Sequence, residues 1–303
     1  MFGEIIGAWI SQVWQDIGAP SDFALVEMGP GRGTLMRDIL RICCKNMDFK
    51  NAADVRLIET SPVLSKQQQA TLSGYDVKWQ NEFHDDFDKP IIFIANELLD
   101  ALPIHQFVKK SAGWQERYIG LSRDSNLEVR LAAPSFDPRL AFQGRDYEPD
   151  TIVELCPAAL QLVRKVAGQI NRGGGAGLFI DYGSAKSGIG DTVQAMSGHA
   201  YADILADPGN ADITAHVDFE RLRNISLKAG LETPDIVGQG AFLKRLGIEL
   251  RAEMLKAQNP EKSEDIQSAL RRLIHNDEMG QLFKVLGMGQ QQLQLAGFGN
   301  VYI

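Results

Sequence analysis

The segment from Phe23 to Leu40, FALVEMGPGRGTLMRDIL, constrains the fold of this chain more than any other stretch. It begins with a short apolar run, typical of a buried parallel strand, and from Thr34 onward its apolar residues recur at helical spacing. Between the two lie Gly29, Gly31 and Gly33. Alternate glycines let the backbone turn sharply and approach a ligand closely, while the next helix points its free N–H groups at that ligand. The segment therefore predicts a strand, a nucleotide-binding loop and a helix.

Details of this loop argue against two kinds of nucleotide site. The dinucleotide pattern G-x-G-x-x-G has its third glycine where this chain has Thr34, and a phosphate-binding P-loop needs a lysine that the loop lacks. Glu27 stands just before the first glycine, where a carboxylate repels a pyrophosphate but suits an ammonium or sulfonium cation. The order acid-x-Gly-x-Gly-x-Gly resembles the first motif of class I S-adenosylmethionine-dependent methyltransferases, whose cofactor has no phosphates. A plain glycine turn is the alternative, and the flanking strand and helix favour a nucleotide site.

Composition limits the class of protein. A chain of 303 residues with 44% hydrophobic content can bury a packed α/β core. The net charge of −8 argues against a nucleic-acid partner and favours a small-molecule or basic polypeptide substrate. Cys43, Cys44 and Cys156 form neither a disulfide framework nor a C-x-x-C metal pair, and no apolar run reaches the ~18 residues of a membrane helix. We expect a soluble intracellular protein without membrane insertion.

A second acid follows the next predicted strand. Residues 55–59, VRLIE, predict a strand that ends at Glu59, where a doubly wound sheet places the carboxylate that accepts both ribose hydroxyls. A solvated edge charge is the alternative reading of Glu59. Thr60 beside it belongs to the same predicted cofactor site. Ser61 then caps a helix whose polar run 65–69 is expected to be exposed.

Two further strands contribute candidate site residues. After a short strand at 77–79, Gln80 and Asn81 are candidates for contact with an adenine edge, and a plain loop is an equal alternative. The continuous apolar strand 91–95 marks a central position and is followed by three polar residues that border the crevice at the carboxyl end of the sheet. These are Asn96, Glu97 and Asp100. We expect them to face the transferred group, although Asn96 and Glu97 can also serve merely to cap the next turn.

Four ordered blocks together resemble the MidA family of methyltransferases, which includes the mitochondrial arginine methyltransferase of respiratory complex I assembly. The blocks are Glu27 to Leu35, Ala95 to Ile104, Asp181 to Gly183 and Asp207 to Phe219. The resemblance implies an α/β Rossmann-like sheet, mostly parallel with an antiparallel last strand. It also implies S-adenosylmethionine as cofactor and a protein substrate with an accessible arginine, either a respiratory complex I subunit or its assembly partner. It places such a protein in the cytoplasm of bacteria or the mitochondrial matrix of eukaryotes.

The resemblance assigns roles to the candidate residues. The loop and Glu27 would hold the methionine moiety, Glu59 the ribose, and Glu97 and Asp100 the acceptor. A carboxylate can grip a guanidinium through two parallel hydrogen bonds, although the residues alone also allow other nitrogen, oxygen or carbon acceptors. The predicted cofactor-binding residues are Glu27, Gly29, Pro30, Gly31, Gly33, Thr34, Glu59, Thr60, Asn81 and Asn96, and the predicted catalytic residues are Asn96, Glu97 and Asp100.

Family members carry an upstream segment rich in Thr, Ser, Pro and Glu that runs into the Phe-Gly-Glu found here at residues 2–4, and this chain lacks it. We expect that segment to complete part of the cofactor and substrate pocket. Two other functions therefore stay open. One is a non-catalytic assembly factor that uses a degenerate pocket to hold a partner. The other is an NAD-dependent oxidoreductase, against which the early third glycine counts.

The remaining chain fits a single methyltransferase domain, residues 1–303, with two insertions. Residues 104–135 alternate polar and apolar side chains, which predicts an antiparallel insertion, and 240–280 predicts helices. A strand is expected at 231–237 and the last strand at 281–288. The polar segment 183–218 carries several Asp and His residues without the spacing of metal ligands, so we expect a functional loop over the crevice and no metal site.

Overall fold

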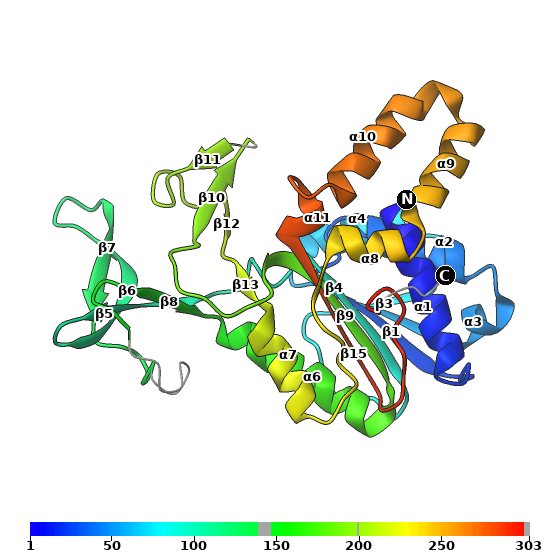
Figure 1. Cartoon of the computed structure of the whole chain (residues 1–303), viewed down its shortest axis with the longest axis horizontal. Helices are drawn as coiled ribbons and strands as arrows, with labels where there is room; N and C mark the ends of the chain where they lie inside the picture. Colours follow the sequence, from blue (N-terminus) through cyan, green and yellow to red (C-terminus); the bar gives the residue numbers. More distant parts are fainter. Residues whose placement is uncertain (139–146, 199, 300–303) are drawn as a thin grey trace.

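A twisted central sheet organises the computed structural model, which describes residues 1–138, 147–198 and 200–299 (Figure 1). The strand order is β14-β15-β9-β4-β1-β2-β3, with β13 paired to the end of β9. Strands β1, β2, β3, β4 and β9 run parallel, and β15 runs antiparallel to β9. This confirms the predicted mostly parallel sheet with an antiparallel last strand. The strands are β1 (Phe23–Met28), β2 (Ala53–Ile58), β3 (Val77–Gln80), β4 (Ile91–Asn96), β9 (Gly175–Ser184), β13 (Val217–Asp218), β14 (Val237–Gly238) and β15 (Phe283–Gly289).

Helices cover both faces of this sheet (Figure 1). Buried parallel strands are apolar on both sides, so in β1 Leu25 packs with α1 and α2 whereas Val26 packs with α6 and α7. Helix α1 is amphipathic, and its buried face carries Ile6, Trp9, Ile10 and Val13 among others. The helices are α1 (Phe2–Asp16), α2 (Thr34–Cys43), α3 (Met47–Ala52), α4 (Pro62–Thr71), α6 (Pro157–Gly173) and α7 (Phe219–Lys228).

An antiparallel sheet of order β7-β6-β5-β8 projects away from the central sheet (Figure 1). Its strands are β5 (His105–Lys110), β6 (Gly113–Leu121), β7 (Leu127–Ala132) and β8 (Ile152–Leu155). Alternation within 104–135 predicted the first three strands. The fourth, β8, is too short for a clear alternation and was not predicted. Residues 134–149 carry no clean sequence pattern, which predicts a loop, and this segment lies partly outside the described residues.

The segment 183–218 corrects the expectation of a long loop without structure of its own. It contains a three-stranded antiparallel sheet made of β10 (Gln194–Ser197), β11 (Ala200–Ala202) and β12 (Asp212–Thr214). Each strand has only three or four residues, which is too few to give a readable period among glycines and aspartates.

A group of helices interrupts the sheet before its last strand. It comprises α8 (Gln239–Arg245), α9 (Ile248–Gln258), the 3-10 turn η1 (Pro260–Lys262), α10 (Ser263–Ile274) and α11 (Met279–Leu282). The sequence of residues 242–255 predicts a single helix, and this prediction is wrong, because Gly247 adopts a left-handed φ of 83° and separates α8 from α9. The strand expected over 231–237 is reduced to β14 and one isolated bridge at Glu232. The division of a 1–303 domain with insertions at 104–135 and 240–280 stays a prediction.

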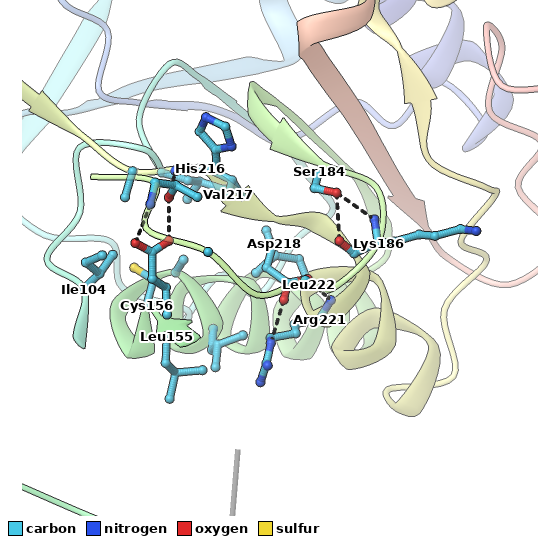
Figure 2. Close-up of a pocket in the computed structure, with 18 of the residues that line it drawn as sticks. Ile104, Leu155, Cys156, Ser184, Lys186, His216, Val217, Asp218, Arg221 and Leu222 are labelled. Atoms are coloured by element: carbon cyan, nitrogen blue, oxygen red, sulfur yellow. Dashed lines mark hydrogen bonds and ion pairs between the residues drawn. The ribbon is translucent and has the colours of Figure 1, made fainter. Parts of the chain in front are cut away.

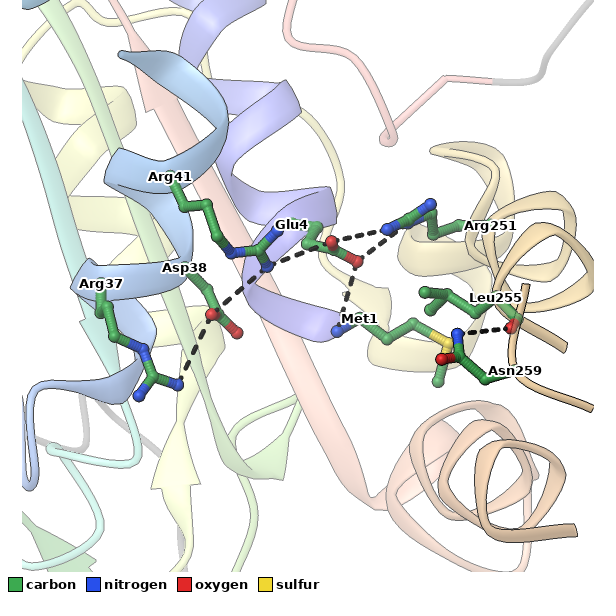
Figure 3. A network of polar contacts seen from close by, with 8 residues as sticks. All are labelled: Met1, Glu4, Arg37, Asp38, Arg41, Arg251, Leu255 and Asn259. Carbon is green, nitrogen blue, oxygen red and sulfur yellow. Dashed lines mark hydrogen bonds and ion pairs between the residues drawn. The ribbon is translucent and has the colours of Figure 1, made fainter. Parts of the chain in front are cut away.

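A buried carboxylate fastens these helices to the amino-terminal helix (Figure 3). Glu4 of α1 accepts hydrogen bonds from Arg251 of α9 at 2.8 and 2.9 Å and from Arg41 of α2 at 3.1 Å. The hydrogen bond from Arg251 is the main reason that the pKa of Glu4 falls to about 2. Three helices that are distant in sequence are therefore joined at one side chain.

Among the described residues, no helix has the length and apolar character needed to cross a membrane.

Candidate active site

The carboxyl ends of three neighbouring strands bring the predicted residues to one edge of the sheet. In β1, Met28 stands opposite Ile58 of β2 on one side and Ala95 of β4 on the other. The residues that follow these strands, among them Glu59 and Asn96, are therefore neighbours of the glycine loop. The amide of Gly29 donates to the carbonyl of Ile58 at 3.1 Å, which fixes the start of the loop against β2.

The three glycines of the loop all adopt left-handed backbone conformations, with φ of 70°, 53° and 75°. At Gly29 a Cβ would lie 2.7 Å from Leu98 Cδ1, and at Gly33 it would lie 3.3 Å from Gln68 Cγ. At Gly31 no atom lies within 4 Å of that position. The loop is thus packed by protein at both ends and open at its centre, which leaves Gly31 free to face a ligand.

The flanking loop residues differ in exposure. Pro30 is buried, and its carbonyl accepts a hydrogen bond from the amide of Gly33 at 2.8 Å. Thr34 is exposed at the first position of α2. Pro30 therefore shapes the turn, whereas Thr34 lies where a bound molecule can reach it.

Glu27 is buried beneath the loop, with only 2% of its surface exposed. Burial raises its pKa to about 8, and a hydrogen bond from the backbone of Met36 offsets only part of this rise. Within the described part of the chain, Glu27 Oε2 has no hydrogen-bond partner. The sequence predicted an ionised carboxylate here. The structure instead holds a carboxyl that keeps its proton near neutral pH until a donor or cation reaches it.

A buried glutamine joins the glycine loop to Glu59. Gln68 Nε2 donates to the carbonyl of Gly31 at 2.8 Å and to Glu59 Oε2 at 3.0 Å, while its Oε1 accepts from Trp79 Nε1 at 3.0 Å. Glu59 Oε1 accepts from the amide of Ser61 at 2.8 Å, so both carboxylate oxygens are oriented. Each oxygen retains a lone pair for a further donor.

Sequence reasoning missed Gln68. The polar run 65–69 was expected to be exposed, and this expectation is wrong for Gln68, which has no exposed surface. Nothing in the run QQQ distinguishes the central glutamine from Gln67 and Gln69, which are exposed. Gln68 faces the interior only because of the helical register of α4, which is set by the packing of α4 against α2.

The predicted adenine contacts are only partly in place. Asn81 and Thr60 are exposed. Gln80, which precedes Asn81 at the end of β3, has a buried Oε1 without a partner among the described residues. An acceptor buried without a donor costs free energy, so Gln80 is a better candidate than Asn81 for contact with a bound group.

The end of β4 forms a strained turn. Asn96 is half-buried and donates from Nδ2 to Glu97 Oε1 at 3.2 Å. Glu97 is exposed and has a left-handed φ of 52°, which is uncommon for a residue with a side chain and costs about 1 kcal/mol or more. Its amide is fixed by a hydrogen bond to the carbonyl of Ile180 at 3.0 Å. The turn therefore presents the Glu97 carboxylate outward from the sheet edge.

Asp181 holds this turn from beneath. Its Oδ2 accepts from the consecutive amides of Leu98, Leu99 and Asp100 at 3.0, 2.7 and 3.3 Å. Its Oδ1 accepts from the amide of Tyr182 at 2.8 Å. The sequence predicted no role for Asp181 beyond its place in one of the four blocks, because the amides that it accepts from at this turn are 81 to 83 residues away. The conformation of the predicted catalytic segment depends on it.

Four carboxylates lie around this turn, those of Glu97, Asp100, Asp181 and Asp212. Burial and, second, the charge of the neighbouring Asp100 together raise the pKa of Asp181 to about 7. Burial also raises the pKa of Asp100, as do the nearby charges of Glu97 and Asp212. In the described part of the molecule, none of the four forms an ion pair with a lysine or arginine, and no cluster of His, Cys, Asp and Glu side chains is arranged to hold a metal ion. We call these residues, Glu97, Asp100, Asp181 and Asp212, the acidic cluster.

Three of the predicted site residues line a cavity of about 630 Å³, whereas Glu27, the loop glycines and Glu59 do not line it. Thr34, Asn96 and Glu97 line it from the sheet edge, and α10 lines it from the opposite side with Asp265 and Arg272 among others. The helices between β14 and β15 thus form one wall of the candidate site. Sequence reasoning placed these helices but gave no sign that they reach the cavity.

A smaller cavity of about 210 Å³ is lined by Leu155, Val217 and Leu222 among others (Figure 2). Glu154 borders it and accepts from Thr192 at 2.9 Å through the amide and 2.5 Å through the hydroxyl. His216 also lines it, and burial lowers the pKa of this histidine. None of the residues predicted from the sequence lines this second cavity, so the larger one is the candidate active site.

Known proteins resemble this chain in both sequence and architecture. The family described as "Putative S-adenosyl-L-methionine-dependent methyltransferase" matches residues 5–237. "Protein arginine methyltransferase NDUFAF7, mitochondrial" of Xenopus tropicalis is 35% identical over 96% of this chain and 74% of that protein. The protein of the same name from Homo sapiens is 32% identical over 97% of this chain and 72% of that protein.

A solved structure from Burkholderia thailandensis, bound to S-adenosyl-homocysteine, has a TM-score of 0.84 and 24% identity to this chain, with 98% of this chain and 78% of that chain covered. This likeness concerns the fold. The family match spans most of the chain, and the relatives exceed 30% identity over nearly all of it. The chain therefore belongs to this family of S-adenosylmethionine-dependent methyltransferases.

Proposed function

We propose that this methyltransferase transfers a methyl group to an arginine of a protein substrate, either a subunit of respiratory complex I or a protein that assembles with it. The names of the relatives support arginine as the acceptor. The acidic cluster is the observation that carries the proposal, because its exposed member Glu97 lines the 630 Å³ cavity and offers a carboxylate that matches a guanidinium. The net charge of −8 also favours a basic polypeptide over a nucleic acid.

The residues at the sheet edge fit the cofactor. S-adenosylmethionine supplies a methyl group on a sulfonium, and its ammonium, ribose and adenine groups offer hydrogen-bond donors. Among the described residues, the two buried side-chain oxygens without partners are Glu27 Oε2 and Gln80 Oε1, and both are acceptors in need of donors. We assign the methionine moiety to Glu27 and the glycine loop, the ribose to Glu59, and the adenine to Gln80. Thr60, Asn81 and Asn96 remain candidates for further contacts.

On the acceptor side, the Glu97 carboxylate would hold the guanidinium in the 630 Å³ cavity through paired hydrogen bonds. Positioning the nitrogen is the main task, because alignment of two reactants alone lowers a barrier by several kcal/mol. The nitrogen must also lose a proton. Asp100, whose pKa is raised by burial and by the charge of Glu97, is suited to accept it.

Intact-mass analysis tests the transfer. Incubation with S-adenosylmethionine and a basic subunit of complex I should add mass in steps of ~14 Da, one for each methylene gained at arginine. A mass gain that maps to lysine or to a carboxylate would contradict arginine as the acceptor.

A non-catalytic assembly factor with a degenerate pocket is the second candidate, favoured only by the exposure of the predicted contacts Thr60 and Asn81. That function predicts tight association with the partner protein and no mass gain. Membership of a methyltransferase family disfavours the NAD-dependent alternative.

The relatives are named as mitochondrial proteins, so we propose the matrix for a eukaryotic chain and the cytoplasm for a bacterial one.

A further inference from the structure

The hairpin formed by β6 and β7 carries an apolar face that is open to solvent. Residues directly opposite each other in the hairpin share a face, as Ile119 and Val129 do, and so do Leu121 and Leu127. Four large side chains on this face are between 43% and 58% exposed, namely Ile119, Leu121, Val129 and Leu131. The opposite face of the same sheet is the one that packs around Phe107. The exposed face therefore does not serve the core of the projecting sheet.

Strand β7 is also an edge strand. In the strand order β7-β6-β5-β8 it pairs with β6 alone, as far as the described residues show. An edge strand of six residues presents a row of N–H and C=O groups that can pair with a further strand. Figure 1 shows β7 at the end of the projecting sheet, remote from α1 and α2.

The sequence of β7, LEVRLA, is complementary to itself when two copies run antiparallel. In the register centred on Val129, each Glu128 stands opposite Arg130 of the other copy. Leu127 then stands opposite Leu131, and the two Val129 side chains face each other. Opposite charges and apolar pairs at directly opposed positions both stabilise a sheet.

Neighbouring registers lack this complementarity. A slip that centres the pairing on Arg130 opposes two arginines, and one that centres it on Glu128 opposes two glutamates. A shift by a single residue places apolar side chains opposite charged ones. The charge pattern of β7 therefore selects one register.

We propose that β7 pairs antiparallel with β7 of a second copy of this chain about a twofold axis at Val129, which joins the two projecting sheets into one. The contact is isologous, so it closes as a dimer. A pair of six-residue strands buries less area than a standard stable interface, so the dimer is weak, with a dissociation constant on the order of micromolar. The inference is independent of the methyl acceptor.

Sedimentation velocity of the whole chain tests this pairing over roughly 1 to 300 µM protein, the range in which a micromolar dimer dissociates. The variants Glu128→Arg and Arg130→Glu each oppose like charges in the proposed register. We expect each to weaken self-association at least tenfold. An equimolar mixture of the two variants restores opposite charges across the axis and should associate about as well as the unsubstituted chain.

The mixture separates pairing between copies from effects within one copy. Glu128 and Arg130 of the same strand lie 2.7 Å apart, and both variants lose this contact. Recovery in the mixture can thus come only from contacts between copies.

Glu249→Arg, on the exposed surface of α9, is the control and should leave association unchanged. If either charge variant is misfolded by circular dichroism, Val129→Arg opposes two arginines at the axis and should also abolish association. A chain that stays monomeric at 300 µM, or a mixture no better than its components, overturns the proposal.

Discussion

Gln68 Nε2 lies 3.0 Å from Glu59 Oε2, and both side chains are buried. The same nitrogen reaches the carbonyl of Gly31, so one amide group sets the separation between the glycine loop and the acid that follows β2. These two parts of the site are the ones that we assign to the methionine moiety and to the ribose of the cofactor. Their relative position is therefore fixed from within the protein before any ligand binds.

Gln68→Ala should weaken cofactor binding by about tenfold, because Glu59 loses an orienting donor and Gly31 loses its tie to α4. The unfolding free energy should fall by about 1–3 kcal/mol, since Glu59 Oε2 and Trp79 Nε1 each lose the hydrogen bond to Gln68. Calorimetric titration with S-adenosylmethionine measures the first effect. Gln69→Ala, one residue further along and exposed, should change neither quantity. Equal affinity in the two variants would refute this role.

Glu27→Gln should change the pH dependence of stability. The folded-state pKa of about 8 exceeds the ordinary value of 4.5, so between these values the folded protein holds a proton that the unfolded chain has released. Stability from this group therefore falls as pH rises through that window, by an amount on the order of 4 kcal/mol. The variant has no ionisable group at this position, so its unfolding free energy should no longer fall with pH in this way. Urea unfolding measured from pH 5 to pH 8 tests this.

Cofactor binding should release a proton through the same residue. A cationic group that binds beside Glu27 favours the ionised carboxylate, so S-adenosylmethionine should displace about one proton at neutral pH. Titrations in buffers with different ionisation enthalpies report this number directly. Glu27→Gln should reduce it to about zero, and an unchanged buffer dependence would show that Glu27 does not meet the bound cation.

Glu97→Gln should abolish methyl transfer and leave cofactor affinity within a few-fold. The substitution keeps the shape and the backbone requirement of the side chain but removes the charge that would hold the guanidinium. We expect a loss of at least about 100-fold in kcat/KM for the protein acceptor. Glu249→Gln on the exposed surface of α9 is the matched control. Parallel loss of cofactor binding in the Glu97 variant would mean that this residue belongs to the cofactor site.

Arg251→Ala should loosen the helices between β14 and β15 from α1 (Figure 3). The depressed pKa of Glu4, about 2, means that this carboxylate stabilises the fold above its ordinary value of 4.5 and loses that effect as pH falls toward 2. The variant should be less stable at neutral pH by about 1–3 kcal/mol and less sensitive to acid over that window. Arg37→Ala, whose guanidinium is 3.7 Å from Asp38 and half exposed, should show little change in either respect.

The central sheet was predictable because its strands are continuous apolar runs whose ends carry distinctive residues. Glu27, Glu59 and Asn96 follow or end such strands, and strand order alone brings them together. The glycine loop was predictable for the same reason, since left-handed backbone at three alternate positions leaves little choice of residue.

The rest of the site depends on contacts that no local pattern records. Gln68 is one glutamine of three, and Asp181 meets the amides of residues 98–100 only after the chain has folded. The raised pKa of Glu27 is likewise a property of its burial and not of its place in the motif. The short strands β10 to β12 and the break at Gly247 were missed because each spans too few residues for periodicity to show.

The left-handed backbone of Glu97 restricts which substitutions this position can tolerate, whatever chemistry the side chain performs. Branched residues such as valine and isoleucine clash with their own backbone in that conformation, whereas asparagine, aspartate and glycine adopt it at low cost. Among distant homologues, a member that had lost catalysis would therefore be expected to drift toward those three residues and not toward an aliphatic one. An aliphatic residue at this position would instead signal that the whole turn had been rebuilt.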